Sequence, residues 1–356
     1  NFFRDDIWRF PIGSNPNFGI YYGGSIVFTD SLPLLAIFFK IFNIFLPENF
    51  QYFSLWILLC IYLQLFFSFK IIYKITNNFS YSVVGSLFFC LATIFLNRSA
   101  IHLSLMGQWI ILSAFYIEII DDKKKLLFRN INILLSVLIH FYFTIILILF
   151  FLFQKIYEFF FKKYSLKKIL KELFILLFSV SLLMYIVGYF TIKLDDGLGW
   201  GYGYFNFNLN GLFNPAGSHN FDSFNWSFFL TELKFQNTEK EGFSYLGISG
   251  IFFLFLFLFN PIHKIKIINF HYNKGQLISI LFLILATSNN INFGDFNIVS
   301  ISINKFLYLF LSSIRASGRL IWPVYYLIFI FGIIIIFKIF KKKKTNFNNN
   351  NFTFYT

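Results

Sequence analysis

The topology of the chain depends on residues 128–158, which read FRNINILLSVLIHFYFTIILILFFLFQKIYE. This stretch is too long for one membrane span, which takes about 17–25 residues, and IHFYFT at 139–144 interrupts it. One long helix would place the Lys-rich segments 121–125 and 155–171 on opposite membrane faces. Two short helices that turn near His140 would place both segments on the same face. The positive-inside rule favours the two-helix interpretation, because the basic segments then agree.

The composition indicates an integral membrane protein. Of the 356 residues, 57% are hydrophobic and only 13% are charged, and the mean hydropathy is +0.67. A soluble domain of this size needs a far more charged surface. The net charge of +14 could indicate nucleic acid, but the lysines stand in short runs between apolar spans, which is typical of topology signals. We therefore expect a lipid bilayer as a partner, and no nucleic acid.

Charge also orients the chain and divides it into parts. Besides 128–158, spans are expected at 50–69, 80–96, 100–119, 172–192, 245–260, 276–291 and 321–337. The Lys-rich loops between them then share one face, which the positive-inside rule makes cytoplasmic. The predicted fold is an all-α polytopic membrane protein, a transmembrane helix bundle with extracytoplasmic loops. Its parts are a first extracytoplasmic loop (1–30), an interfacial or re-entrant helix (31–46), the first part of the bundle (50–192), an extracytoplasmic loop (193–244), the second part of the bundle (245–340) and a cytoplasmic basic, Asn-rich tail (341–356).

The opening loop carries three candidate catalytic acids, Asp5, Asp6 and Asp30. Asp5 and Asp6 could hold a divalent metal, act as a general base or lie in a solvated turn. Asp30 lies in IVFTDSLP, where the chain re-enters apolar surroundings. A carboxylate there is costly unless it is paired, bound to a metal or capping a helix. Because Pro33 follows, Asp30 also resembles an N-cap, and a cap and a functional role are compatible.

The 193–244 loop is rich in Gly, Asn, Tyr and Trp. Aromatic faces beside amide and carboxylate groups suit sugar recognition, because sugar CH groups stack on rings while Asn and Asp bond the hydroxyls. The alternative is an ordinary surface loop with interfacial aromatics. Glu241, just before the next span, is a candidate for orienting a ligand.

The most informative short motif is SSIRASGRLIWP at 312–323. Arg315 and Arg319 are four residues apart and would share one face of a helix. Arginines at an extracytoplasmic boundary run against the positive-inside rule, and Arg binds phosphate bidentately. A lipid phosphate is the expected partner. The alternative is snorkelling, or pairing with Asp295.

Two histidines stand among polar groups at the same expected membrane depth. His102 follows Arg98 in NRSAIHLSLMGQW, which also holds Gln108, and His140 stands at the turn between the two short helices. A lone His in a bundle is usually a satisfied structural group. Convergence of these groups with the arginines instead favours a binding site for the phosphate or substrate.

Three stretches carry a family resemblance: FRDDIWRFPIGSNPNFGIYYGGSIVFTDSLPLLAIFFK, ENFQYFSLWILLC and RASGRLIWPVYYL. They resemble an uncharacterised family of bacterial multi-span membrane proteins that is distantly similar to GT-C glycosyltransferases. The resemblance implies a GT-C-like bundle in the bacterial cytoplasmic (inner) membrane and a polyprenyl-phosphate-linked sugar as partner. It also implies an acidic motif in the first outer loop and basic residues near the carrier phosphate. In that class the first acid usually follows the first span, and we expect such a span before residue 1.

The leading hypothesis is a membrane glycosyltransferase that moves a sugar from a polyprenyl-phosphate carrier to an acceptor at the extracytoplasmic face. A carboxylate would deprotonate the acceptor or hold a divalent metal, the one cofactor considered. Arg315 and Arg319 would neutralise the phosphate leaving group. The alternatives are a non-catalytic flippase or polymerase-like partner for envelope polysaccharide, and a structural membrane protein with an outer binding loop.

Overall fold

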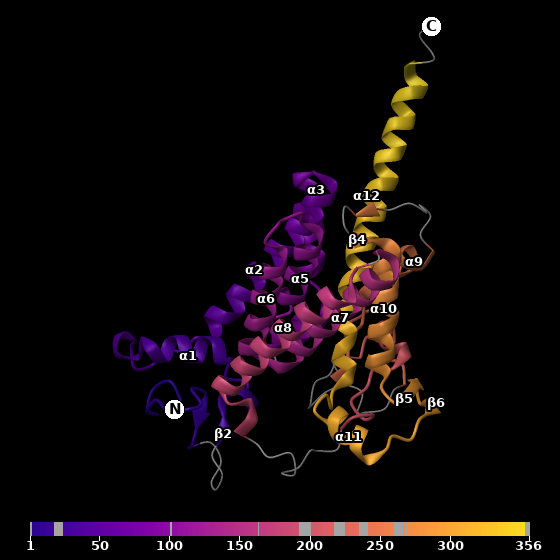
Figure 1. The fold of residues 1–356 in the computed structure, drawn as a ribbon. Helices are drawn as coiled ribbons and strands as arrows, with labels where there is room; N and C mark the ends of the chain where they lie inside the picture. Colours follow the sequence, from indigo (N-terminus) through magenta and orange to yellow (C-terminus); the bar gives the residue numbers. More distant parts are fainter. Residues whose placement is uncertain are drawn as a thin grey trace.

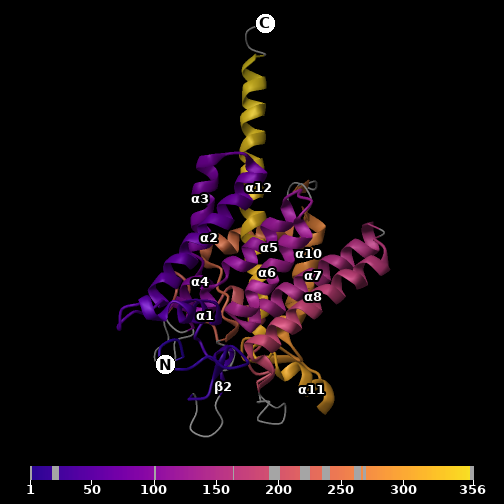
Figure 2. The same ribbon diagram turned by 60° about the vertical axis from the view of Figure 1, so that its left-hand side comes forward.

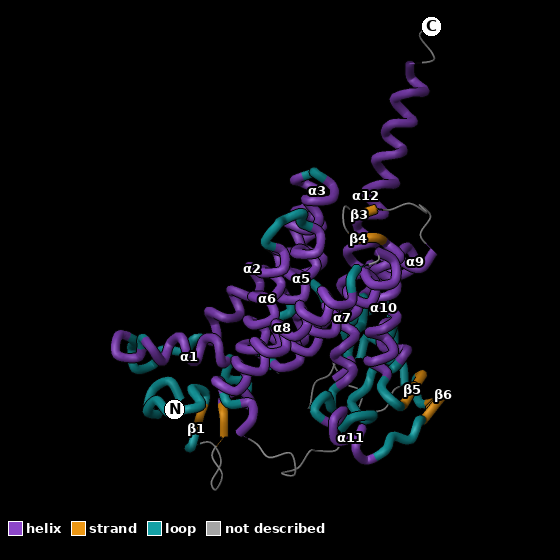
Figure 3. The backbone as a smooth tube through the Cα atoms, in the orientation of Figure 1, coloured by secondary structure: helices purple, strands orange, loops and turns teal. Residues whose placement is uncertain are grey.

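The computed structural model describes residues 2–17, 24–99, 102–162, 164–191, 201–216, 225–234, 241–259, 266–267 and 270–352. Helix holds 68% of the residues and strand 5%, so the predicted helical class is confirmed. Figures 1 and 2 show a bundle of tilted helices from which α12 extends at one end. Figure 3 shows that loops and short strands collect mainly at the other end.

The helices follow one another along the whole chain. Their bounds are α1 Pro33–Ile41, α2 Phe53–Thr76, α3 Phe79–Cys90, α4 Thr93–Leu96, α5 Trp109–Ile119, α6 Lys125–Ile139, α7 Phe141–Lys162, α8 Leu166–Val187, α9 Gly247–Phe259, α10 Tyr272–Thr287, α11 Lys305–Ser312 and α12 Trp322–Phe352. Short 3-10 turns are η1 Ile26–Phe28, η2 Asn43–Phe45, η3 Asn97–Ser99, η4 Leu103–Met106, η5 Tyr189–Thr191, η6 Leu209–Leu212 and η8 Ser317–Ile321. The strands pair as three small antiparallel hairpins: β1 Ser14–Asn15 with β2 Gly24–Ser25, β3 Lys266–Ile267 with β4 Phe270–His271, and β5 Asn290–Phe293 with β6 Phe296–Ser300.

In the described part of the chain, four helices are long and apolar enough to cross a membrane: Phe53–Thr76, Phe141–Phe161, Leu166–Val187 and Ser317–Lys342. A fifth crossing is available if α3 and the following Thr93–Ser99, bent by 48°, act as one span. These helices support a multi-pass membrane protein. The spans predicted at 100–119, 245–260 and 276–291 are shorter than expected, at Leu103–Ile119, Gly247–Phe259 and Asn273–Thr287.

The stretch 128–158 is broken where the sequence predicts. α6 ends at Ile139, His140 is extended (φ −166°, ψ 139°), and α7 begins at Phe141. The two helices pack against each other. α7 is longer than the short helix predicted, because its apolar residues continue into 159–161.

The core forms around α12, which packs against α2, α3, α9 and α10. Trp322, Tyr325 and Tyr326 are buried there. Tyr326 donates a hydrogen bond of 2.5 Å to Gln108 and accepts one of 2.8 Å from Gln64, which joins α12 to two other parts of the bundle. At the periphery, α8 buries only Ile169, Leu176, Val180 and Val187, and many of its other apolar side chains are exposed. Exposed apolar helix faces are suited to contact with lipid.

The two ends of the bundle differ. We call the lower end in Figure 1 the site end; it holds residues 2–17 and 24–32, the β5–β6 hairpin and α11. The opposite, Lys-rich end holds the α2–α3 turn, the β3–β4 hairpin and the C-terminal half of α12. α1 lies across the direction of α12 and projects sideways (Figure 1), with exposed Phe38 and Ile41. This orientation fits an interfacial helix at 31–46, which stays a prediction.

Candidate functional site

Asp30 is held by two side chains from a distant segment. Its Oδ2 lies 2.6 Å from Nδ1 of His102, and Ser104 donates a hydrogen bond to its Oδ1. Asp30 is not an N-cap: the residue at that position of α1 is Leu32, in the left-handed region (φ 53°), and Pro33 begins the helix. The sharp backbone turn at Leu32 carries Asp30 away from the helix end, so its carboxylate is free to meet His102 and Ser104.

The carboxylate of Asp30 remains charged in this setting. Burial raises its pKa, but the hydrogen bonds with His102 and Ser104 and the charges of His102 and His140 lower it, and together they outweigh burial. The side chain is still 40% exposed, and that of His102 is 37% exposed. Asp30 is therefore an oriented, ionised and accessible carboxylate that can accept a proton.

Beside this group lies the Glu241 cluster, made of Arg98, Glu241 and Arg319. Oε2 of Glu241 lies 3.2 Å from Nη1 of Arg98 and 2.7 Å from Nη2 of Arg319, whose Nε is 3.1 Å away. Arg98 also donates to the backbone oxygen of Glu241 at 3.3 Å. Burial raises the pKa of Glu241, but the two guanidinium charges outweigh it and lower the pKa to about 2. Two cations share one anion, so the cluster has an excess positive charge.

Two glycines allow the segments that carry this cluster to touch. A Cβ on Gly318 would lie 2.6 Å from Cα of Gly242 and 2.9 Å from the backbone oxygen of Asn206. Gly242 follows Glu241 and Gly318 precedes Arg319. Because neither glycine has a side chain, the carboxylate of Glu241 and the guanidinium of Arg319 can come within hydrogen-bonding distance.

The candidate residues of the site come from breaks between helices. Asp30 precedes α1, Arg98 lies in η3, His102 precedes η4, Glu241 precedes α9 and Arg319 lies in η8. Irregular backbone at membrane depth is tolerated where it is buried in protein or lines a cavity. The shortened span at 100–119 is explained in this way, because the polar residues at its start turn the chain toward the site.

His140 lies next to the same cluster through Tyr142. Nδ1 of His140 accepts a hydrogen bond of 3.2 Å from the backbone N–H of Tyr142. The Tyr142 hydroxyl accepts one of 2.7 Å from the N–H of Ala316, and the guanidinium of Arg319 stacks 4.5 Å from its ring centre. The break at His140 thus positions an aromatic support for Arg319.

Arg315 and Arg319 do not share a helix face, contrary to the helical interpretation of their spacing. α11 ends at Ser312 and the chain turns before η8, so Arg319 is buried in the Glu241 cluster whereas Arg315 is exposed. Arg315 lies 5.9 Å from the ring centre of Phe205 and forms no ion pair within the described part of the chain. Asp295, the alternative partner for these arginines, instead pairs with Lys234: its Oδ2 lies 3.9 Å from Nζ of that lysine.

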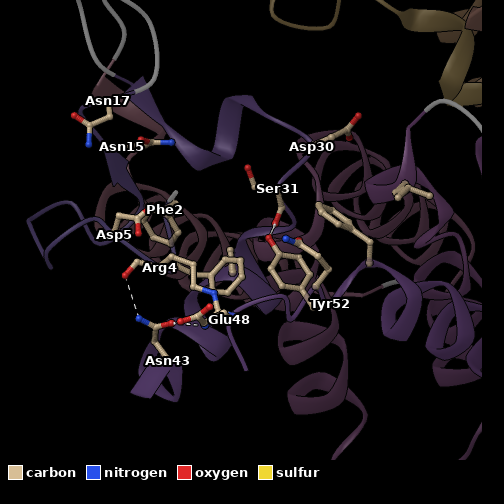
Figure 4. Close-up of a pocket in the computed structure, with 15 residues that line it drawn as sticks. Phe2, Arg4, Asp5, Asn15, Asn17, Asp30, Ser31, Asn43, Glu48 and Tyr52 are labelled. Atoms are coloured by element: carbon tan, nitrogen blue, oxygen red, sulfur yellow. Dashed lines mark hydrogen bonds between the residues drawn. The ribbon is translucent and has the colours of Figure 1, made fainter. Parts of the chain in front are cut away.

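A cavity of about 990 Å³ opens beside Asp30, and Asp5 is part of its lining (Figure 4). Asp6 instead accepts a hydrogen bond of 2.6 Å from Asn17. No group of three or more His, Cys, Asp and Glu side chains gathers as a metal site within the described residues. Asp5 and Asp6 therefore do not make a metal centre with described partners.

The described parts of the 193–244 loop are 201–216, 225–234 and 241–244, and the rest of that predicted loop lies outside the described residues. Its asparagines at 206, 208, 210 and 214 are buried. Their amides donate to backbone oxygens, those of Asn206 and Asn208 outside the loop and those of Asn210 and Asn214 within it; the bond from Asn208 to Gly294, for example, is 2.9 Å. The amide N–H groups of these asparagines hold the loop in place, and sugar recognition by this loop stays a prediction.

Sequence reasoning did not single out Arg98 and Ser104 as site residues. Arg98 had a signal, since a buried cation at the end of an apolar segment requires a partner. Ser104 had no signal of its own, because a serine two residues after His102 is unremarkable until the fold brings Asp30 to it.

A family comparison matches residues 1–347 to the model described as "Domain of unknown function (DUF6311)". The chain belongs to the DUF6311 family. The match extends over the Asp30 group and the whole Glu241 cluster, so the site of this DUF6311 protein lies inside the family's domain. No curated protein and no solved structure matches the chain.

Proposed function

We propose that this protein is a membrane glycosyltransferase of the inverting type, which moves a sugar from a polyprenyl-phosphate carrier to an acceptor hydroxyl. The proposal places the site end on the extracytoplasmic face of a bacterial inner membrane, with the Lys-rich end in the cytoplasm. The observation that carries it is the oriented, accessible carboxylate of Asp30 at a polar cavity, beside two arginines that share one glutamate.

In the proposed reaction, the acceptor oxygen attacks the anomeric carbon while its proton passes to Asp30. The bond from that carbon to the carrier phosphate breaks, and the phosphate leaves with the electron pair. His102, donating from Nδ1, and Ser104 fix the carboxylate in place. A positioned general base contributes about 10²–10⁴-fold to such a step.

The leaving phosphate needs positive charge. Glu241 neutralises only part of the charge of Arg98 and Arg319 and holds both guanidinium groups in place. Exposed Arg315 supplies a further cation near the same segment. Arginine suits this role because its fork matches phosphate oxygens.

The first experiment measures binding of a polyprenyl phosphate, and of the polyprenol of equal length, to the purified full chain in detergent. We expect the phosphate to bind tighter, and Arg315→Gln to weaken it about tenfold, since a charge-assisted hydrogen bond contributes about 1.5–3 kcal/mol and 1.4 kcal/mol is tenfold. The matched control is Arg9→Gln, because Arg9 is also an exposed arginine but lies in the opening loop. Equal affinity for the two lipids overturns the proposal.

The second experiment measures release of the carrier phosphate from a panel of polyprenyl-phosphate sugars. Asp30→Asn keeps the shape of the side chain but removes the base, so we expect transfer to fall about 10²–10⁴-fold while carrier binding is retained. Asp295→Asn is the control, because Asp295 is exposed and does not line the cavity. Full activity of Asp30→Asn would exclude Asp30 as the base.

A further inference from the structure

The cavity beside Asp30 has a wall of side chains that are already engaged. Arg4 donates to Oδ1 of Asn43 at 3.1 Å and to backbone oxygens of residues 46, 47 and 50. Tyr52 donates from its hydroxyl to the backbone oxygen of Ser31 at 2.5 Å. Figure 4 shows the Arg4–Asn43 and Tyr52–Ser31 bonds at the edge of the cavity. These contacts fasten the opening segment to the connection between α1 and α2, and so give the cavity a fixed shape.

A second set of lining groups is free. Asp5, Glu48 and Gln51 are exposed, and their side chains make no hydrogen bond or ion pair with any described residue. The amide oxygen of Asn15, which lines the same cavity, is buried and has no hydrogen-bond partner in the described structure. The exposed carboxylates of Asp5 and Glu48 only accept hydrogen bonds, which suits a ligand rich in hydroxyl or amino donors.

The charges of the lining are unbalanced. Among the described residues of the lining, Asp5, Asp30 and Glu48 contribute three carboxylates, of which Asp30 is bonded to His102, whereas Arg4 is the one cation and is occupied by carbonyl oxygens. The positive charge of the site lies instead in the Glu241 cluster and at Arg315, none of which lines the cavity. The lining of the cavity is therefore acidic, whereas the cationic groups of the site lie outside that lining.

We infer that the cavity is the acceptor subsite and that it takes an uncharged or amine-bearing carbohydrate while excluding acidic sugars. This inference rests on the proposed transferase function and names its acceptor class. Like charge opposes the entry of a carboxylate or phosphate, whereas an ammonium group or a hydroxyl meets free carboxylate and amide oxygens. The volume of about 990 Å³ lies at the upper end of the range of about 300–1,000 Å³ for small-molecule sites.

The test uses the purified full chain in nanodiscs without any carrier lipid. Binding of the methyl glycosides of glucosamine, glucose and glucuronic acid is followed by saturation-transfer NMR and by calorimetry. We expect affinity to fall in that order, with about a tenfold difference between the amine and the acid, since exposed ion pairs contribute up to about 1 kcal/mol each and 1.4 kcal/mol is tenfold.

The double variant Asp5→Asn, Glu48→Gln should reduce the amine-to-acid ratio to about one while the neutral glycoside still binds. Asp295→Asn is the matched control and should leave the ratio unchanged. Glu48→Gln alone, at an exposed position without partners in the described chain, should lower the ratio in part if the double variant does not fold.

The inference is overturned if no glycoside binds, if the glucuronide binds as well as the glucosaminide, or if neither variant changes the ratio. These results are independent of the carrier-binding experiment, because no carrier is present. Loss of carrier binding with a preserved sugar preference would refute the transferase and leave a carbohydrate-binding cavity. The reverse result would leave a carrier-binding protein and refute the acceptor subsite.

Discussion

The Glu241 cluster at the site end and a second cluster at the Lys-rich end both surround a carboxylate with cations. They differ in how far that carboxylate is exposed to solvent. In the second, the Glu118 cluster, Glu118 lies 2.7 Å from Arg129, 3.1 Å from Lys125 and 3.9 Å from Lys274. The side chain of Glu118 is 4% exposed, whereas that of Glu241 is 27% exposed. The closed cluster has no room for a ligand, and the open one adjoins accessible Asp30.

The comparison separates a structural from a functional use of the same groups. Glu118 joins α5 to α6 and to α10, so its ion pairs hold three helices together. Glu241 instead joins segments that lie between helices, next to Asp30 and its cavity. We therefore expect changes at Glu118 to act on stability, and changes around Glu241 to act on the site.

The largest loss of stability should follow Glu118→Gln. Removing one partner of a buried ion pair leaves uncompensated charge and costs about 3–5 kcal/mol. The measurement is the free energy of unfolding in detergent, by denaturant titration. The control is Glu232→Gln, an exposed glutamate, for which we expect a change below about 0.5 kcal/mol. Similar stability of the two variants would show that the Glu118 cluster is not structural.

Gly318→Ala should have a smaller effect on stability and a specific one on the Glu241 cluster. The new Cβ would lie 2.6 Å from Cα of Gly242, so one segment must shift, and overpacking of this kind costs about 1–3 kcal/mol. We expect carrier binding to fall as Arg319 moves from Glu241. Gly247→Ala is the comparison, because its Cβ would meet nothing within 4 Å, so it reports backbone strain alone. Unchanged carrier binding in Gly318→Ala would show that the contact between Gly318 and Gly242 does not position the site.

Much of the architecture could be predicted from patterns within short segments. The break at His140 follows from an apolar stretch too long for one span, and the helical class follows from composition. Asp30, His102 and Glu241 could be singled out one by one, because polar groups beside apolar spans are costly unless they are used. The sequence could not say which of them meet.

The pairings depend on contacts between distant segments. Glu241 meets Arg98 and Arg319 across 143 and 78 residues. The helical argument for Arg315 and Arg319 failed because the chain turns between α11 and η8, and no local periodicity reveals such a turn. In the Glu118 cluster, Lys125 and Arg129 are near Glu118 in sequence, but the third cation, Lys274, lies far along the chain and its approach could not be predicted.

The smallest effect should appear as a pH dependence that distinguishes the two regions of the molecule. The folded-state pKa of Glu241 is about 2, below its ordinary value of 4.5, since two guanidinium groups outweigh burial. A lowered folded-state pKa gives stability that is fully present above pH 4.5 and is lost as pH falls through about 2. Partial exposure to solvent screens this contribution and keeps it modest.

The free energy of unfolding is therefore measured between pH 5 and pH 3 for wild type and for Glu241→Gln. We expect the wild type to lose stability more steeply than Glu241→Gln, because the amide does not titrate. Parallel pH profiles would mean that Glu241 is not paired with Arg98 and Arg319 in solution. The comparison between the open Glu241 cluster and the closed Glu118 cluster would then be wrong.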